Sequence, residues 1–360
     1  MSILQKYVLR EWFWATLAVS VLLLVVLMGA YMGNLVNDIA DGRMPAGLLG
    51  TLLLLHLPSL LNTILPLAGF IAVLWVLGRL YADQEMAVMR SSGFGWKKLL
   101  WPLLNLTLPL AAVLLVLGLD VTPTAARMAE RQLELAFRSA TLWGLQPGKF
   151  HVLKHGDLVV YAGSIDADGR TLRNIFIKQL RQGREQVWVA KKGRYWVDQK
   201  SGGHFLSLEQ GKVTDMARNR PDVRVLDFER NDLRLPQPEY RKDRDAVSHA
   251  PSLQLLREGN PHSFAEFQWR ISPAISAMVL ALLAIPLAHS EPREGRGVRI
   301  VLGVLVYLLY GNILFLCRSW VAEGVVPAVI GIWWVHLAFL ILAFAWIRKQ
   351  GRFAGQGAAA

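Results

Sequence analysis

Long uncharged apolar runs alternate with short charged segments near both ends of the chain. The runs cover residues 12–33, 44–78, 99–119, 271–289, 300–317 and 324–347. About 18 or more apolar residues can cross the hydrocarbon core of a membrane as one helix. The pattern therefore predicts an integral membrane α-helical protein with six transmembrane helices, three in residues 1–122 and three in residues 263–360. Pro58 and Pro66 predict a kink or a tilt in the longest run.

The positive charges beside these runs predict their direction across the membrane. The opposite short loops hold two cations, Arg43 and Arg318. The side that holds both termini has twelve: Lys6, Arg10, Arg79, Arg90, Lys97, Lys98, Arg293, Arg296, Arg299, Arg348, Lys349 and Arg352. Because short cytoplasmic loops carry the excess of Lys and Arg, both termini are predicted to be cytoplasmic. The long segment between the two groups of runs is then predicted to lie outside the cytoplasm.

That long segment has a different pattern. Residues 120–270 hold 25 Lys/Arg and 19 Asp/Glu, and after Pro147 and Gly148 the apolar period changes to two. Short alternating runs at 149–153, 158–161, 175–177, 186–190, 194–197, 204–208 and 223–228 predict strands, with Gly and Asp turns between them. We therefore expect an all-β domain with a stem and a linker over 123–262, a sandwich, roll or barrel.

Several of these strands carry apolar residues on both faces. Two interpretations fit: a tightly closed core, or an apolar groove open to a lipid or a partner strand. Further on, Ser263 and Glu266 fit the capping-box spacing and predict that the helix leading into the 271–289 run begins there.

The charged segment at 79–92 lies between two predicted spans and contains helix-forming residues throughout. Asp83 and Glu85 precede Arg90, which complements a helix dipole, and Gly93 follows as a C-terminal stop. Such a segment is often only a solvated connector. Its mixture of methionine with acidic residues favours a second interpretation, a coupling helix that transmits movement from a cytosolic partner into the membrane.

Composition and motifs narrow the function classes. The chain is 53% hydrophobic and 18% charged with a mean hydropathy of +0.33, and its net charge of +12 is explained by the flanks of the spans, without a nucleic-acid-binding motif. No phosphate-binding loop, H-E-x-x-H motif or nucleophile elbow is present, and the one cysteine, Cys317, lies in an apolar run. We expect no cofactor, no metal and no catalysis. A coupling helix without a nucleotide site suggests the permease half of an ABC transporter; a non-transporting membrane anchor for the β domain is the alternative, and a lipid-modifying enzyme is disfavoured.

Several segments carry a resemblance to a known family. They are Ile64–Leu67, Gly78–Tyr81, Glu85–Met89 with Gly93, Glu266–Ile271, Pro286–Leu287 and Pro292–Arg296. Together they resemble the LptF/LptG permeases of lipopolysaccharide export, and the last three favour the LptF branch. The similarity covers the whole chain, including the order of three spans, β domain and three spans.

The resemblance implies a function and a set of partners. It implies a subunit of the bacterial inner membrane that pairs with an LptG-type permease, two LptB-type ATPase subunits and an LptC-type protein. The complex would extract lipopolysaccharide from the outer leaflet and pass it through a periplasmic jellyroll domain to a bridge of similar domains.

The resemblance also implies site residues. Glu85, with Tyr81, Asp83, Met89 and Arg90, would contact the ATPase. Arg318 matches a basic position that contacts lipopolysaccharide phosphates. In the first span, Tyr31 and Asn34 stand where relatives have basic residues, and Arg43 is a candidate substitute.

Overall fold

The computed structural model describes residues 2–40, 44, 46–139, 147–153, 158–166, 170–181, 184–197, 204–217, 223–235, 246–289 and 296–356. The chain divides into two compact units. One, the helical unit, comprises Met1–Met32, Thr51–Ala129 and Arg244–Ala360. The other, the β unit, comprises Gly33–Gly50 and Glu130–Asp243.

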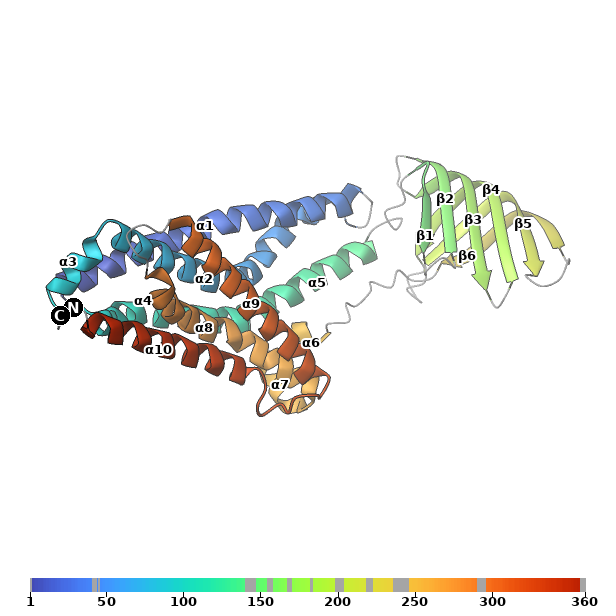
Figure 1. The fold of residues 1–360 in the computed structure, drawn as a ribbon. Helices are drawn as coiled ribbons and strands as arrows, with labels where there is room; N and C mark the ends of the chain where they lie inside the picture. Colours follow the sequence, from blue (N-terminus) through green and yellow to red (C-terminus); the bar gives the residue numbers. More distant parts are fainter. Residues whose placement is uncertain are drawn as a thin grey trace. The chain divides into compact units, whose positions relative to one another are not determined.

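Most of the long helices match predicted spans (Figure 1). They are α1 (Ile3–Ala40), α2 (Leu49–Ala82, after a 3₁₀ turn at Ala46–Leu48), α4 (Trp96–Val116), α8 (Pro261–Ala288), α9 (Arg296–Ala322) and α10 (Trp333–Gln356). Within the described residues, five helical stretches are long and apolar enough to cross a membrane: Ile3–Ala40, Ala46–Ala82, Lys97–Ala136, Pro261–Leu287 and Val298–Ala322. The prediction of membrane helices is confirmed.

The sixth predicted span begins later than the sequence suggested. Residues 324–332 form turns, with positive φ angles at Gly324 and Gly331, and α10 starts at Trp333. The Gln268 side chain satisfies this turn segment, because its Nε2 donates to the Ala328 carbonyl at 2.6 Å and its Oε1 accepts from the Ile332 amide at 3.1 Å. The Gln268 side chain thus satisfies backbone groups of residues that the apolar pattern alone predicts to be helical.

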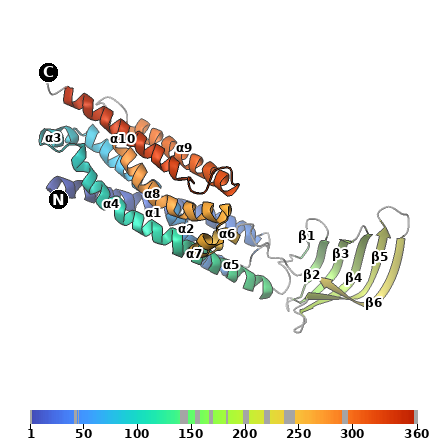
Figure 2. The same cartoon turned by 90° about the horizontal axis from the view of Figure 1, so that it is seen from below.

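Helix α8 is the centre of the helical unit. Its apolar window is 78% buried, against 11% for α1, and it packs against α4, α9 and α10 (Figure 2). Small residues recur along it: Ala265, Ser272, Ala274, Ser276, Ala277, Ala281, Ala284 and Ala288 are all buried. Small side chains allow helix backbones to approach closely in a membrane, which explains why this helix lies in the middle.

The helix that begins with α4 does not end at Asp120, contrary to expectation. It passes through a π-helical segment, Leu117–Val121, and continues as α5 (Thr122–Ser139). At Gly118 a Cβ atom would overlap the carbonyl oxygen of Arg270 in α8. The glycine therefore permits a very close backbone approach at the π segment, a feature often found where a helix must adjust its register.

The β unit confirms the all-β prediction. Its described strands form one antiparallel sheet in the order of the sequence: β1 (Phe150–Leu153), β2 (Leu158–Ile165), β3 (Thr171–Arg181), β4 (Arg184–Val197), β5 (His204–Ala217) and β6 (Val223–Leu235). The two strands predicted at 186–190 and 194–197 are one strand, β4. Gly193 lies between the two predicted segments, at a position of β4 where a Cβ atom would crowd the side chains of Ile175 and Leu208.

A crease crosses this sheet. At one row of neighbouring positions the regular pairing is interrupted on strands β2 to β6: Gly163, Asn174, Lys191, Gln210 and Glu229. Asn174 and Gln210 have φ angles of 53° and 52°, in the left-handed region. On β4 the buried positions are even before the crease, at Trp188 and Ala190, and odd after it, at Gly193 and Tyr195. The change of parity explains why the strands carry apolar residues at both odd and even positions.

The connection back to the helices is also ordered by polar contacts. Helices α6 (Ala246–His249) and α7 (Ser252–Glu258) precede α8. The cap of α8 is Asn260, whose Oδ1 accepts from the Ser263 amide at 2.7 Å, with Pro261 at the first helical position. The predicted start at Ser263 is therefore wrong by two residues, and Glu266 does not close a capping box because its carboxylate is engaged elsewhere.

Candidate functional site

The predicted helix at 79–92 is divided in two. Arg79 and Tyr81 belong to the last turn and a half of α2, and the short helix α3 (Glu85–Ser91) follows a turn at Asp83 and Gln84. Gln84 has a φ angle of 64°, which breaks the helix, and Gly93 at φ 78° ends the segment. A single left-handed residue cannot continue a right-handed helix, so α3 is a separate helix from α2.

The two methionines of α3 face inward. Met86 and Met89 are 2% and 6% exposed and belong to the main core of the helical unit. Met89, predicted as a partner-facing residue, instead holds α3 against the other helices. Val88 is 70% exposed, and Asp83, Ala87 and Arg90 are exposed as well. The helix thus presents an apolar residue between charged ones on its outer face.

A polar network ties α3 to the first turns of α1. The Tyr7 hydroxyl donates to Glu85 Oε2 at 3.3 Å, and Arg79 Nη2 donates to Tyr7 Oη at 3.3 Å and to Glu11 Oε2 at 2.9 Å. Tyr7 and Glu11 were not among the predicted site residues. They lie some seventy positions from α3 in the sequence, and the pairing depends on how α1 packs beside α2, which no local pattern reveals.

The other predicted residues of this region form a separate pair. Arg90 Nη2 donates to the Tyr81 hydroxyl at 2.9 Å, and the guanidinium lies 5.5 Å from the Tyr81 ring centroid. Tyr81 in turn makes an edge contact with the His289 ring at 5.2 Å. Arg90 therefore links α3 to the end of α2, and through Tyr81 to the residue that follows α8.

Arg318, predicted to bind phosphate, is part of an ion cluster. Its Nη2 donates to Glu266 Oε2 at 2.7 Å, and its guanidinium lies 4.9 Å from the Trp269 ring centroid. Glu266 Oε1 also accepts from Arg270 Nε at 3.0 Å. One carboxylate thus faces two guanidinium groups, which leaves a net charge of +1. The Arg270 and Glu266 side chains are 5% and 9% exposed and that of Arg318 is 31% exposed, so the surplus charge is accessible at Arg318.

Arg270 binds the segment that connects the β strands to α8. Its guanidinium donates to the carbonyls of Val247, Ser248 and Ala250 and to Ser252 Oγ. Ser252 Oγ itself donates to the carbonyl of Leu119 in the π segment. At the end of α7, hydrogen bonds from Ser263 and Gln254 lower the pKa of the Glu258 carboxyl. Helices α6 and α7 are therefore attached to α8 and to the π segment through side-chain bonds.

A buried polar network lies in the middle of α8, α9 and α10. Tyr310 Oη lies 2.5 Å from His336 Nδ1 and 3.1 Å from Ser276 Oγ, and His336 Nε2 lies 3.1 Å from Ser272 Oγ. A cavity of about 150 Å³ adjoins it and is also lined by Asn62 and Tyr307. His336 lies within the apolar run predicted as the sixth span, and no pattern in the sequence predicted a role for it.

Two further positions belong to the first span and the loop that follows it. Arg43 lies outside the described residues. Tyr31, at a position where the family resemblance implies a basic residue, stacks on His56 with ring centroids 3.8 Å apart. Within the part of the chain that the structure describes, no group of three or more His, Cys, Asp or Glu residues is placed to hold a metal ion.

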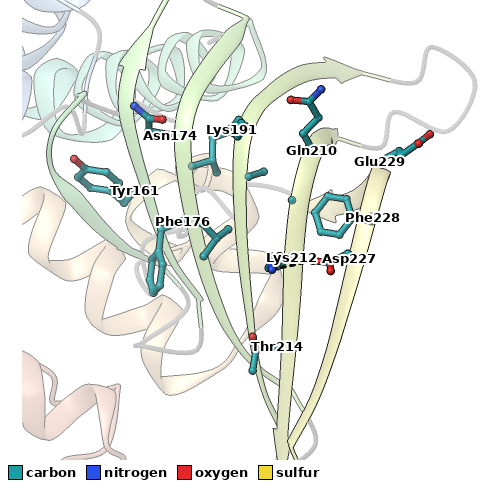
Figure 3. Close-up of a pocket in the computed structure, with 14 residues that line it drawn as sticks. Tyr161, Asn174, Phe176, Lys191, Gln210, Lys212, Thr214, Asp227, Phe228 and Glu229 are labelled. Atoms are coloured by element: carbon teal, nitrogen blue, oxygen red, sulfur yellow. Dashed lines mark ion pairs between the residues drawn. The ribbon is translucent and has the colours of Figure 1, made fainter.

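The β unit carries an open pocket of about 970 Å³ along the crease (Figure 3). Aromatic rings of Tyr161, Phe176 and Phe228 are spread across it, and Lys212 and Asp227 form an ion pair of 3.4 Å at its margin. Leu158, Ile177 and their neighbours form a buried cluster that adjoins this pocket and shares Ile175 and Ala190 with it. The sheet therefore has both a buried core and an open groove.

Comparison with known proteins covers nearly the whole chain. Residues 6–349 match the family described as lipopolysaccharide export system permease LptF/LptG. The chain is 27% identical over 344 residues to the lipopolysaccharide export system permease protein LptF of Escherichia coli K12, which covers 95% of this chain and 93% of that protein. The protein of the same name from Shigella flexneri gives the same figures.

Proposed function

Because the chain belongs to the LptF/LptG family of lipopolysaccharide export permeases, we propose that it is the LptF-type subunit of a transporter that extracts lipopolysaccharide from the outer leaflet of the inner membrane. Family membership makes it a multi-pass inner-membrane permease that transports lipopolysaccharide and has no catalytic role. An LptG-type permease is its expected partner, together with two LptB-type ATPase subunits that supply the energy and an LptC-type protein. Both termini then lie in the cytoplasm and the β unit in the periplasm.

The observation that carries the coupling role is the two-sided construction of α3. Its inner face is fixed by Met86 and Met89, and its outer face exposes Val88 beside Asp83 and Arg90. A rigid helix with an exposed apolar residue surrounded by charges suits a groove on a protein partner. Because Glu85 is bonded to Tyr7 on α1, a push on α3 reaches the first span directly. We propose that the ATPase moves the spans through this contact.

The lipid route is supported by the charge of the Glu266 cluster. In the proposed orientation Arg318 lies at the outer end of its span, and the cluster retains a net charge of +1 after internal pairing. An exposed guanidinium donates two parallel hydrogen bonds to a phosphate more readily than an ammonium does. We propose that Arg318 holds a phosphate of lipopolysaccharide and that the pocket along the crease of the β unit receives its acyl chains.

Site-specific photocrosslinking in cells tests the coupling role. A crosslinker at Val88 should capture the LptB-type ATPase, because that side chain is 70% exposed. The same crosslinker at Met86, two residues away on the same helix but buried, is the matched control and should capture no ATPase. If Val88 gives no ATPase adduct while the protein is expressed and inserted normally, the non-transporting anchor becomes the better account.

A further inference from the structure

A long groove lies along α1 on the side that faces α2 and α4. Its volume is about 680 Å³. Its walls are mainly apolar, with Phe13, Leu17 and Leu24 on α1, Leu65 on α2, and Leu106 and Val113 on α4. Two of its polar groups are satisfied within their own helices, because Thr16 donates to the Trp12 carbonyl at 2.7 Å and Asn105 to the Trp101 carbonyl at 2.8 Å. Along these walls the groove therefore offers a mainly apolar surface.

One end of the groove is positively charged. Lys6 and Arg10, one helical turn apart on α1, line it there, and both are exposed. The nearest acidic side chain on the helix, Glu11, is paired with Arg79 at 2.9 Å. Within the described residues neither Lys6 nor Arg10 has an ion-pair partner. Their charges are thus available to bind an anion at one end of the apolar groove.

We propose that this groove is a binding site for an anionic glycerophospholipid, with one acyl chain between α1, α2 and α4 and the phosphate on Lys6 and Arg10. The length fits this occupant. From Phe13 to Leu24 the apolar wall extends about 17 Å along the helix axis. One leaflet contributes roughly 15 Å to a hydrocarbon core of about 30 Å. A chain that starts at the charged end therefore lies along the groove to the middle of the membrane.

A partner helix fits this groove less well. A helix about 10–12 Å wide that crosses the membrane occupies on the order of 2,000–3,000 Å³. It could lie over the groove but could not enter a space of about 680 Å³. A helix across the opening would also need acidic residues opposite Lys6 and Arg10, whereas a phospholipid supplies its anion at the same level as the head groups.

Photolabelling of the full-length chain in phosphatidylcholine nanodiscs tests this site. The probe is phosphatidylglycerol with a photoactivatable group near the end of one acyl chain, and phosphatidylcholine with the same chain is the zwitterionic reference. We expect the anionic probe to label the peptides of residues 13–24 and 105–113 about 25-fold more than the reference does, because two exposed basic residues contribute roughly fivefold each at an anionic surface. The Lys6→Gln/Arg10→Gln double variant should therefore label at the reference level.

Matched variants separate the site from general lipid contact. Arg348→Gln/Lys349→Gln removes the same charge from exposed positions of α10 and should leave labelling unchanged. Leu17→Trp fills the groove and should lower labelling, whereas Leu22→Trp, at an exposed position of α1 outside the groove, should not. Equal labelling by the two probes, or labelling that the Lys6 and Arg10 changes leave intact, would overturn the proposal.

The assembled complex supplies a second measurement. Labelling should persist when the LptG-type partner is present, and its loss there would identify the groove as a protein interface instead. The measurement uses no lipopolysaccharide and no ATP. A negative labelling result therefore does not contradict the export function. If the export function were contradicted, the labelling result would still decide whether the phospholipid site exists.

Discussion

At the scale of single residues, buried polar side chains are what distinguish this membrane unit from a simple apolar bundle. Ser272, Ser276, Tyr310 and His336 satisfy one another between three helices. Removing one member of such a network leaves its partners unsatisfied in an apolar environment, which costs more than the bond itself contributes. The network therefore fixes which faces of α8, α9 and α10 pack together.

Tyr310→Phe should lower the free energy of unfolding by about 1–3 kcal/mol, because His336 and Ser276 lose their shared partner. Thermal unfolding of the full-length chain in detergent measures this loss. Tyr307→Phe is the matched control, because Tyr307 lines the same cavity and its hydroxyl forms no hydrogen bond within the described residues. Equal losses for both variants would show that ring contacts, rather than hydrogen bonds, hold this region.

The sequence predicts some of these residues and not others, for physical reasons. Glu85 and Arg318 stand beside apolar runs, where charged residues are conspicuous, and the family resemblance gave them roles that stay predictions. Tyr7, Glu11 and His336 were not predicted, because their partners are dozens of positions away and depend on helix packing. Met89 was assigned to a partner, although the structure places it in the core; the pattern of a seven-residue helix does not show which side the rest of the protein covers.

At the scale of elements, the apolar pattern predicts which helices and strands form, whereas specific side chains determine where they begin and end. Gln84 divides the charged segment, Gln268 delays α10, and Asn260 starts α8 early. The strand pattern was ambiguous because the crease reverses which positions face inward. If one strict alternation is assumed through residues 184–197, about half of β4 is assigned to the wrong face.

The close approach of the π segment to α8 gives a test at this scale. Gly118→Ala should destabilise the chain by about 1–3 kcal/mol, because the added methyl group overlaps the Arg270 carbonyl and must push two helices apart. Gly78→Ala, in α2 with open space around the position, should stabilise it by about 0.5–1 kcal/mol through helix propensity. The two changes should therefore shift the unfolding midpoint in opposite directions, and a shift in the same direction would contradict the assigned packing.

At the scale of the whole molecule, the Glu266 cluster combines two tasks that can be separated. Glu266 and Arg270 hold the returning chain to the helices, whereas Arg318 keeps an accessible charge. Loss of the carboxylate leaves buried Arg270 without a counter-charge. Loss of Arg318 leaves the buried pair intact and removes the net charge of the cluster.

Glu266→Gln should accordingly cost about 3–5 kcal/mol of stability, as for other broken buried ion pairs. Arg318→Gln should cost within about 1 kcal/mol, because that side chain is partly exposed, yet it should reduce photocrosslinking of lipopolysaccharide to the complex severalfold. Unfolding midpoints and lipid adducts measured on the same preparations distinguish the two. Unchanged lipid adducts in Arg318→Gln at full stability would remove Arg318 from the lipid route.

The order of strands in the β unit has a consequence for how the protein is made. Every strand that the structure describes pairs with the next one in the sequence, so the sheet has a low contact order. The helical unit, in contrast, needs α8 to reach α4, which precedes it by more than a hundred residues. During synthesis the sheet can therefore assemble hairpin by hairpin before the last three helices leave the ribosome. We expect the β unit to be the first region to gain protection from proteolysis, and the helices to complete their core only after α8 arrives.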